Sequence, residues 1–284
     1  MRTIILALCA LITNYVIAQT DTLNIYINTG QVRTIDSNLI AAKAFNKSSD
    51  FNFDAQVFRF NKGTSVYLQI HNEDTVNHVV DIESFVSQVS VKKNDVVGIT
   101  LPFNNVGAFR IFESSENADQ RYLGLSGLFV VEEKFRGHFF WNLKEFQSNM
   151  NQVIAEGGSM DLTNYRPNYF LINGLSNPKI DQDTLAKVRG NVGDTLQLFV
   201  LNSGNAVHSL HFHGYHVKVI YSSRSSEVVG WVKDTYALYK GEVVQLEIVP
   251  DKPGEYPVHD HNLVAITANN IYPKGMFTTL VIKP

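Results

Sequence analysis

Cysteine is nearly absent from this sequence, because the only one among 284 residues is Cys9, close to the N-terminus. Disulfides form and persist in oxidising compartments, but a chain without a second cysteine cannot form one within itself even there. Beyond residue 9 there is also no thiolate that could bind a metal. The composition therefore excludes any metal site in the rest of the chain that depends on a cysteine ligand.

An excess of charge and a long apolar run are missing as well. The net charge is −3 and no run of like charges occurs, which argues against a nucleic-acid-binding or anionic-membrane surface. The apolar run at residues 4–12 follows Arg2 and is too short for a membrane span. The spacing of small residues up to Ala18 predicts a cleaved signal peptide of residues 1–18, and hence a secreted or periplasmic protein without a membrane span.

Apolar residues recur with a period of two over most of the chain, which predicts strands such as 57–60, 65–70 and 195–200. Many short strands separated by turns indicate an all-β protein built from antiparallel sandwiches. Residues 141–156 show near-helical spacing and precede two glycines. Because the two halves resemble each other, we expect domains at 19–140 and 165–284, joined by a linker with a short helix at 141–164.

Histidines cluster in the second half, where five of the nine lie in two short segments. In a strand, His211 and His213 project to one face, and so do His259 and His261. If the two strands are neighbours, four imidazoles converge and form a donor set suited to copper or zinc. The alternative is a set of solvated or hydrogen-bonded strand histidines, which the clustering makes less favourable.

Residues 208–215, His-Ser-Leu-His-Phe-His-Gly-Tyr, resemble the multicopper oxidase motif His-Pro-Met-His-Leu-His-Gly-His. Residues 169–174 and 233–235 resemble flanking family segments, so the likeness is good over 165–284 and fainter over 55–135. The resemblance implies two cupredoxin-like Greek-key β-sandwich domains and copper as the cofactor. By the same resemblance to two-domain relatives, we expect a homotrimer whose cluster lies between the first domain of one subunit and the second domain of the next.

The resemblance also implies ligand roles. It assigns His211 to the type 2 copper, and His213, His259 and His261 to the type 3 pair. In the first half, residues 77–81 stand where the family has His-Trp-His, which leaves His78 as a candidate type 2 ligand. Residues 112–114, Phe-Glu-Ser, stand where the family has His-Ser-His.

The type 1 (blue) site departs from the family pattern. The resemblance assigns His208 to it, but Asp260 replaces its cysteine, and Ala265 stands near the place of its second histidine. Met276 remains as a possible axial ligand. A blue site needs a copper–thiolate bond, so we expect none here, and His208, Asp260 and Met276 are the weaker metal candidates. We expect Asp260 and His208 to form a buried hydrogen-bonded pair in that cavity.

Three functions fit these observations. The first is a copper-dependent oxidoreductase that takes electrons directly from a small-molecule reductant, without four-electron reduction of oxygen. The second is a periplasmic copper carrier or buffer without turnover. The third is a scaffold-only cupredoxin that binds a partner. The sequence identifies no substrate and no catalytic residue.

Overall fold

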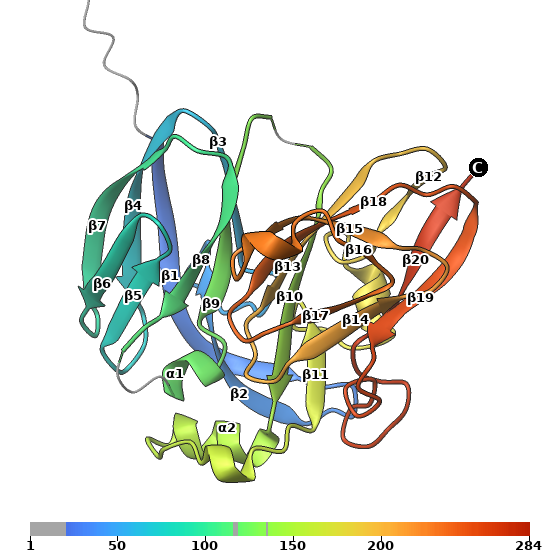
Figure 1. Ribbon diagram of the computed structural model, residues 1–284. Helices are drawn as coiled ribbons and strands as arrows, with labels where there is room; N and C mark the ends of the chain where they lie inside the picture. Colours follow the sequence, from blue (N-terminus) through green and yellow to red (C-terminus); the bar gives the residue numbers. More distant parts are fainter. Residues whose placement is uncertain (1–20, 116–118, 135) are drawn as a thin grey trace, which may run out of the picture.

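The computed structural model describes residues 21–115, 119–134 and 136–284 (Figure 1). The predicted signal peptide and Cys9 lie outside the described residues. None of the helices within these ranges combines the length and the apolar character needed to cross a bilayer.

The first domain is a sandwich of two sheets. One sheet has the order β2-β1-β4-β7, with β1 (Asp21–Arg33), β2 (Leu39–Asn46), β4 (Thr64–Asn72) and β7 (Val96–Phe103). The other has the order β3-β9-β8-β5-β6, with β3 (Val57–Asn61), β5 (His78–Ile82), β6 (Val86–Val91), β8 (Gly107–Glu113) and β9 (Ser126–Glu132). A short helix, α1 (Asp119–Tyr122), precedes β9.

The second domain has a similar topology, with two strands, β15 and β16, added to its first sheet. Its first sheet runs β11-β10-β13-β18-β15-β16, with β10 (Phe139–Phe146), β11 (Tyr169–Ile172), β13 (Leu196–Asn202), β15 (Val217–Ser222), β16 (Val232–Lys233) and β18 (Val243–Ile248). The second sheet runs β12-β20-β19-β14-β17, with β12 (Arg189–Asn191), β14 (His208–Phe212), β17 (Thr235–Leu238), β19 (Gly254–Asp260) and β20 (Phe277–Lys283). Single turns of 3₁₀ helix lie at η1 (Leu162–Asn164), η2 (Lys179–Gln182) and η3 (Ser226–Val228). The predicted all-β architecture of two sandwiches is confirmed.

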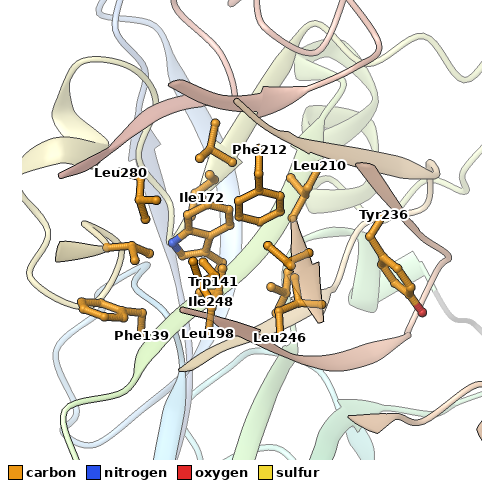
Figure 2. Close-up of a cluster of buried hydrophobic side chains, with 14 of the residues drawn as sticks. Phe139, Trp141, Ile172, Leu198, Leu210, Phe212, Tyr236, Leu246, Ile248 and Leu280 are labelled. Atoms are coloured by element: carbon orange, nitrogen blue, oxygen red, sulfur yellow. The ribbon is translucent and has the colours of Figure 1, made fainter. Parts of the chain in front are cut away.

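The two domains pack against each other through strands that are buried on both faces. In β9, Phe129 lies in the core of the first domain, whereas Leu128 belongs to an apolar cluster between the domains. In β10, Trp141 enters the core of the second domain and Phe140 faces the cluster between the domains. Figure 2 shows the Trp141 indole beside the ring of Phe212, with the two ring planes parallel and their centroids 6.2 Å apart.

The segment that separates the two halves differs from its prediction. Residues 141–146 belong to strand β10, and only α2 (Ser148–Ala155) is helical. A strand buried on both faces shows no alternation of apolar and polar residues, so its apolar positions merged with those of α2 into a helical spacing. The helix ends at Ala155, and Gly157, just after the C-cap Glu156, has a φ of +87° that is accessible to glycine without strain.

Candidate metal centre

Four histidines meet on one face of the second domain, which we call the four-histidine face. Strands β14 and β19 are antiparallel neighbours, and His211 lies directly opposite His259. His213 and His261 lie just beyond the ends of these strands. The ring centroids of His211 lie 4.6, 5.6 and 5.5 Å from those of His213, His259 and His261, in that order, and the centroids of His213 and His259 are 5.0 Å apart.

Neighbouring groups engage the Nδ1 atoms of two of these rings. His259 Nδ1 donates to the carbonyl oxygen of Asp260 at 2.8 Å, and the ring stacks on Phe277. Nδ1 of His211 lies 2.9 Å from the hydroxyl of Thr235, which pairs with His211 from the neighbouring strand β17. Such contacts commonly orient metal-binding histidines and select the nitrogen that stays available. In both rings the available atom is Nε2.

The Nε2 atoms of His213 and His259 lie 2.9 Å apart, within hydrogen-bonding distance of each other. Two nitrogens bound at right angles to one metal, with bonds of roughly 2.0–2.1 Å, lie about 2.9 Å apart. Burial, followed by the neighbouring His211 and His259, lowers the pKa of His213, which favours the neutral form that binds metals. The pair therefore fits two adjacent ligands of one ion.

The remaining rings do not complete a closed site. Within residues 21–115, 119–134 and 136–284, no three histidine, cysteine, aspartate or glutamate side chains are already placed to hold one ion. His213 and His261 are exposed, and their side chains have room to rotate. A site with more than two ligands from this face requires such a rotation.

Two of the residues that the resemblance assigns to the type 1 site, His208 and Asp260, belong to a buried ion network. His208 Nδ1 lies 2.6 Å from Asp260 Oδ2, and His208 Nε2 lies 3.0 Å from Glu145 Oε2. The exposed fractions of His208, Asp260 and Glu145 are 1, 0 and 1%. The expected pair of Asp260 and His208 is therefore present, with Glu145 as a third member that the sequence reasoning missed. Met276 is buried in the apolar core, and its carbonyl accepts a hydrogen bond from the Asp260 N–H.

Hydrogen bonds within this network favour the charged forms of His208 and Glu145. Burial alone would lower the pKa of His208, but the hydrogen bonds to Asp260 and Glu145 outweigh it and raise that pKa to about 9. Burial alone would raise the pKa of Glu145, but the bond from His208 outweighs it and lowers that pKa to about 2. His208 is thus an imidazolium whose two N–H groups both face carboxylates, so it has no lone pair for a metal.

His78 forms the counterpart of this network in the first domain. Its ring nitrogens lie 2.7 Å from Glu113 and 2.8 Å from Asp74, and Lys43 pairs with Asp74. Burial opposes protonation, but the bonds to Asp74 and Glu113 outweigh it and raise the pKa of His78. Because both nitrogens are engaged and the side chain is fully buried, His78 is not placed as a metal ligand, contrary to the alignment with His-Trp-His.

Strand register explains this correction. Two residues after His78, Val80 pairs with Glu113, just as Leu210, two residues after His208, pairs with Asp260. His78 therefore corresponds to His208. By the same register, the first-domain counterparts of the four histidines carry no imidazole, and they are Asp81, Glu83, Phe112 and Ser114.

Two of the other histidines have unrelated surroundings. His71 stacks on Tyr26 and bonds to Asn24, and His216 is exposed. His138 lies at the start of β10, away from β14 and β19 in sequence and sheet.

Comparison with known proteins shows where this architecture occurs. Residues 155–283 match the model of a multicopper oxidase domain family. The blue copper oxidase from Nitrosomonas europaea superposes with a TM-score of 0.77 at 16% identity, over 93% of this chain and 86% of that one. The multicopper oxidase mgLAC gives 0.77 at 17% identity, over 93% and 86%. The copper nitrite reductase from Nitrosomonas europaea gives 0.70 at 16% identity, over 93% and 94%. The curated proteins contain no match.

Proposed function

We propose that the chain is a degenerate member of the multicopper oxidase family, which binds copper on the four-histidine face and exchanges electrons there directly with a small reductant. One observation carries the proposal: the Nε2 atoms of His213 and His259 converge at 2.9 Å, while the Nδ1 atom of His259 is engaged elsewhere. Copper held by these nitrogens would supply one-electron redox chemistry.

The protein's own residues define how that face works. Thr235 and the Asp260 carbonyl hold the rings of His211 and His259 with Nε2 outward. The exposure of His213 and His261 leaves the face open to small molecules. Because an ion network occupies the place of the electron-entry copper, a reductant has to reach the four-histidine face itself.

The exposure of His213 and His261 also favours a second function, that of a copper carrier or buffer. Exposed ligands exchange a bound metal more readily than a closed cage does, because the outgoing ion needs no opening of the fold. Both functions suit an exported protein, and the signal-like residues 1–18 support a secreted or periplasmic location.

Copper titration of the exported protein tests the proposal, after mass spectrometry has established an N-terminus at Gln19. We expect about one copper per chain, an electron paramagnetic resonance spectrum typical of nitrogen ligands, and no intense blue absorption, because no cysteine is available. His259→Ala should weaken binding at least about 100-fold, since it removes a ligand rather than a group that orients one.

His216→Ala provides the matched control, since this exposed histidine is not part of the four-histidine face. Equal affinities of the wild type and the His259→Ala variant would contradict the proposed site. Reduction of bound copper by ascorbate with repeated turnover supports the oxidoreductase, whereas binding without turnover supports the carrier.

We further propose that copies associate so that the four-histidine face of one chain meets the first domain of the next, as in the two-domain relatives that this chain resembles. The first domain offers a hollow of about 380 Å³ lined by Asp81, Glu83 and Phe112, the counterparts of three of the histidines. A carboxylate there would face a metal bound by the neighbouring chain and would add an oxygen ligand.

Sedimentation and thermal unfolding with and without copper test this assembly. Copper should raise the thermal midpoint of a trimer, because a shared ion stabilises only the assembled form. Asp81→Asn should remove part of that rise while leaving the metal-free protein nearly unchanged, whereas Asp95→Asn, on an exposed turn, should have no effect. A monomer with the full copper-induced shift would exclude the shared site.

A further inference from the structure

A second polar site lies where the two domains meet, apart from the four-histidine face. It is a cleft of about 190 Å³ between the ends of β8 and β9 in the first domain and β10, β13 and β18 in the second. Its walls carry His138, Glu132, Lys134 and Arg136, and the ring of Phe199 packs against His138. Nothing in the proposed copper chemistry uses these residues.

Glu132 and His138 approach each other closely but do not form an aligned hydrogen bond. His138 Nδ1 and Glu132 Oε1 are 2.7 Å apart, yet both atoms are buried without an aligned partner. The other carboxylate oxygen of Glu132 accepts from Arg59 Nε at 2.7 Å, which fixes the group. Nδ1 of His138 therefore faces Glu132, and Nε2 is the ring nitrogen left to meet a ligand.

The charges that face His138 are mainly positive. Arg59 donates to the backbone of Arg136, and Lys134 and Arg136 line the cleft. Glu133 also lines the cleft and is paired there with Lys62, so two carboxylates face the three cationic side chains of Arg59, Lys134 and Arg136. The lining residues from β13 and β18, which are Gln197, Phe199 and Gln245, and those from β8, which are Val106 and Gly107, do not titrate.

We propose that this cleft binds a small oxyanion, a carboxylate or a phosphate, through His138, Lys134 and Arg136. Among the described residues, none bonds to His138 Nε2, so this atom is the one that meets the ligand. His138 is protonated when the anion binds. The imidazolium then donates from Nε2 to the ligand and from Nδ1 to Glu132. A divalent cation fits poorly, because the carboxylates of Glu132 and Glu133 are already paired with Arg59 and Lys62.

The unliganded cleft disfavours the protonated ring. Burial lowers the pKa of His138, and Arg59 and Arg136 add to this effect, which together exceed the opposing effect of Glu132. Binding of an anion reverses part of this balance, so the complex takes up a proton. Affinity should therefore rise as pH falls toward the free histidine's pKa, by at most about tenfold per pH unit for one linked proton.

Nuclear magnetic resonance of the histidine rings in the full-length mature protein tests the site with inorganic phosphate and with acetate as probes. We expect a saturable shift of the His138 resonances, a higher His138 pKa in the presence of the probe, and tighter binding at pH 5.5 than at pH 7.5. The exposed His216 should keep its pKa, and Arg136→Gln should weaken binding by about tenfold, the loss of one charge-assisted contact.

Arg33→Gln is the matched control, because Arg33 is an exposed arginine that does not line the cleft. His138→Gln, which keeps a polar side chain, should abolish the pH dependence even if some affinity remains. The proposal is overturned if neither probe shifts His138 saturably, if the affinity is independent of pH, or if only zinc ions shift its resonances. Because none of these residues belongs to the four-histidine face, the result is independent of copper binding.

Discussion

Replacing Glu145 by alanine should lower the free energy of unfolding by about 3–5 kcal/mol, the usual cost of leaving one member of a buried ion pair without its partner. Glu145 accepts hydrogen bonds from His208 at 3.0 Å, from the hydroxyl of Tyr165 at 2.7 Å, and from the backbone N–H groups of Asn205 and Ala206 at 2.5 and 2.8 Å. Alanine leaves all four donors unsatisfied and leaves the His208 imidazolium with one carboxylate instead of two.

Urea denaturation of the wild type and the variant measures this effect. Glu133→Ala is the matched control, since Glu133 is exposed and its ion pair with Lys62 lies at the surface. Surface pairs contribute at most about 1 kcal/mol, so the control should unfold close to the wild type. A loss below about 1 kcal/mol for Glu145→Ala would show that the network does not carry the stability assigned to it.

The same network should make stability depend on pH through His208. Its folded pKa of about 9 lies above the unfolded value of 6.5, so its contribution is complete below pH 6.5 and is lost as pH rises through 9. One proton corresponds to about 1.4 kcal/mol per pH unit, which gives a total loss of roughly 3 kcal/mol. Glu145 acts at the other end of the scale, because its pKa of about 2 makes its contribution disappear only in strong acid.

A second buried group, Lys144, changes the stability with pH in the opposite direction, so its effect has to be separated from that of His208. Burial lowers the pKa of Lys144 from 10.5 to about 8, so its unfavourable burial is relieved as pH rises from 8 to 10.5. The difference in unfolding free energy between the wild type and His208→Gln isolates the histidine, because both proteins carry Lys144. This difference should be largest below pH 6.5 and shrink up to about pH 9.5.

Chemical denaturation at steps between pH 5 and 9.5 gives this difference curve. His216→Gln serves as the control, because an exposed histidine outside the network should leave the curve of the wild type unchanged. A constant difference between wild type and His208→Gln across this range would mean that His208 is neutral in the folded protein.

The sequence predicted the strand-rich architecture and located the histidines of the second domain. It did not reveal Glu145, the buried partner of the neighbouring His208. The spacing of His211, His213, His259 and His261 is local, and strand geometry alone places them on common faces. Glu145 belongs to strand β10, which is buried on both faces. In a sequence with near-helical apolar spacing, its charged side chain reads as the polar face of a helix. Its partnership with His208 depends on a contact across 63 positions, which no local pattern reveals.

The misplacement of His78 has a different origin. The first half lacks the histidines of the family motif, so the alignment of residues 77–81 with His-Trp-His places His78 at a ligand position. A signal for the correct register was available, because an asparagine precedes both His78 and His208 by six residues, at Asn72 and Asn202. Both asparagine side chains donate to the carbonyl four residues ahead and so shape the same turn.

The two buried networks take one of their carboxylates from different elements. In the first domain the carboxylate comes from Asp74 in the turn, and Thr29 on β1 donates to it at 2.8 Å. In the second domain the carboxylate comes from Glu145 on β10, and the turn carries Gly204, where a Cβ would lie 1.7 Å from that carboxylate. Strand register makes Thr29 and Glu145 equivalent, as it does Asp74 and Gly204.

This arrangement has a consequence for how the protein matures. Each sandwich buries a histidine whose two ring nitrogens both face carboxylates, and these contacts raise the pKa of the ring in both domains. The folded state of each domain is thus complete before any ion arrives. In many small metalloproteins, by contrast, the free energy of metal binding is also the free energy of folding. Here the folding of each domain does not depend on a metal, so under the proposed function copper would add to a domain that is already folded.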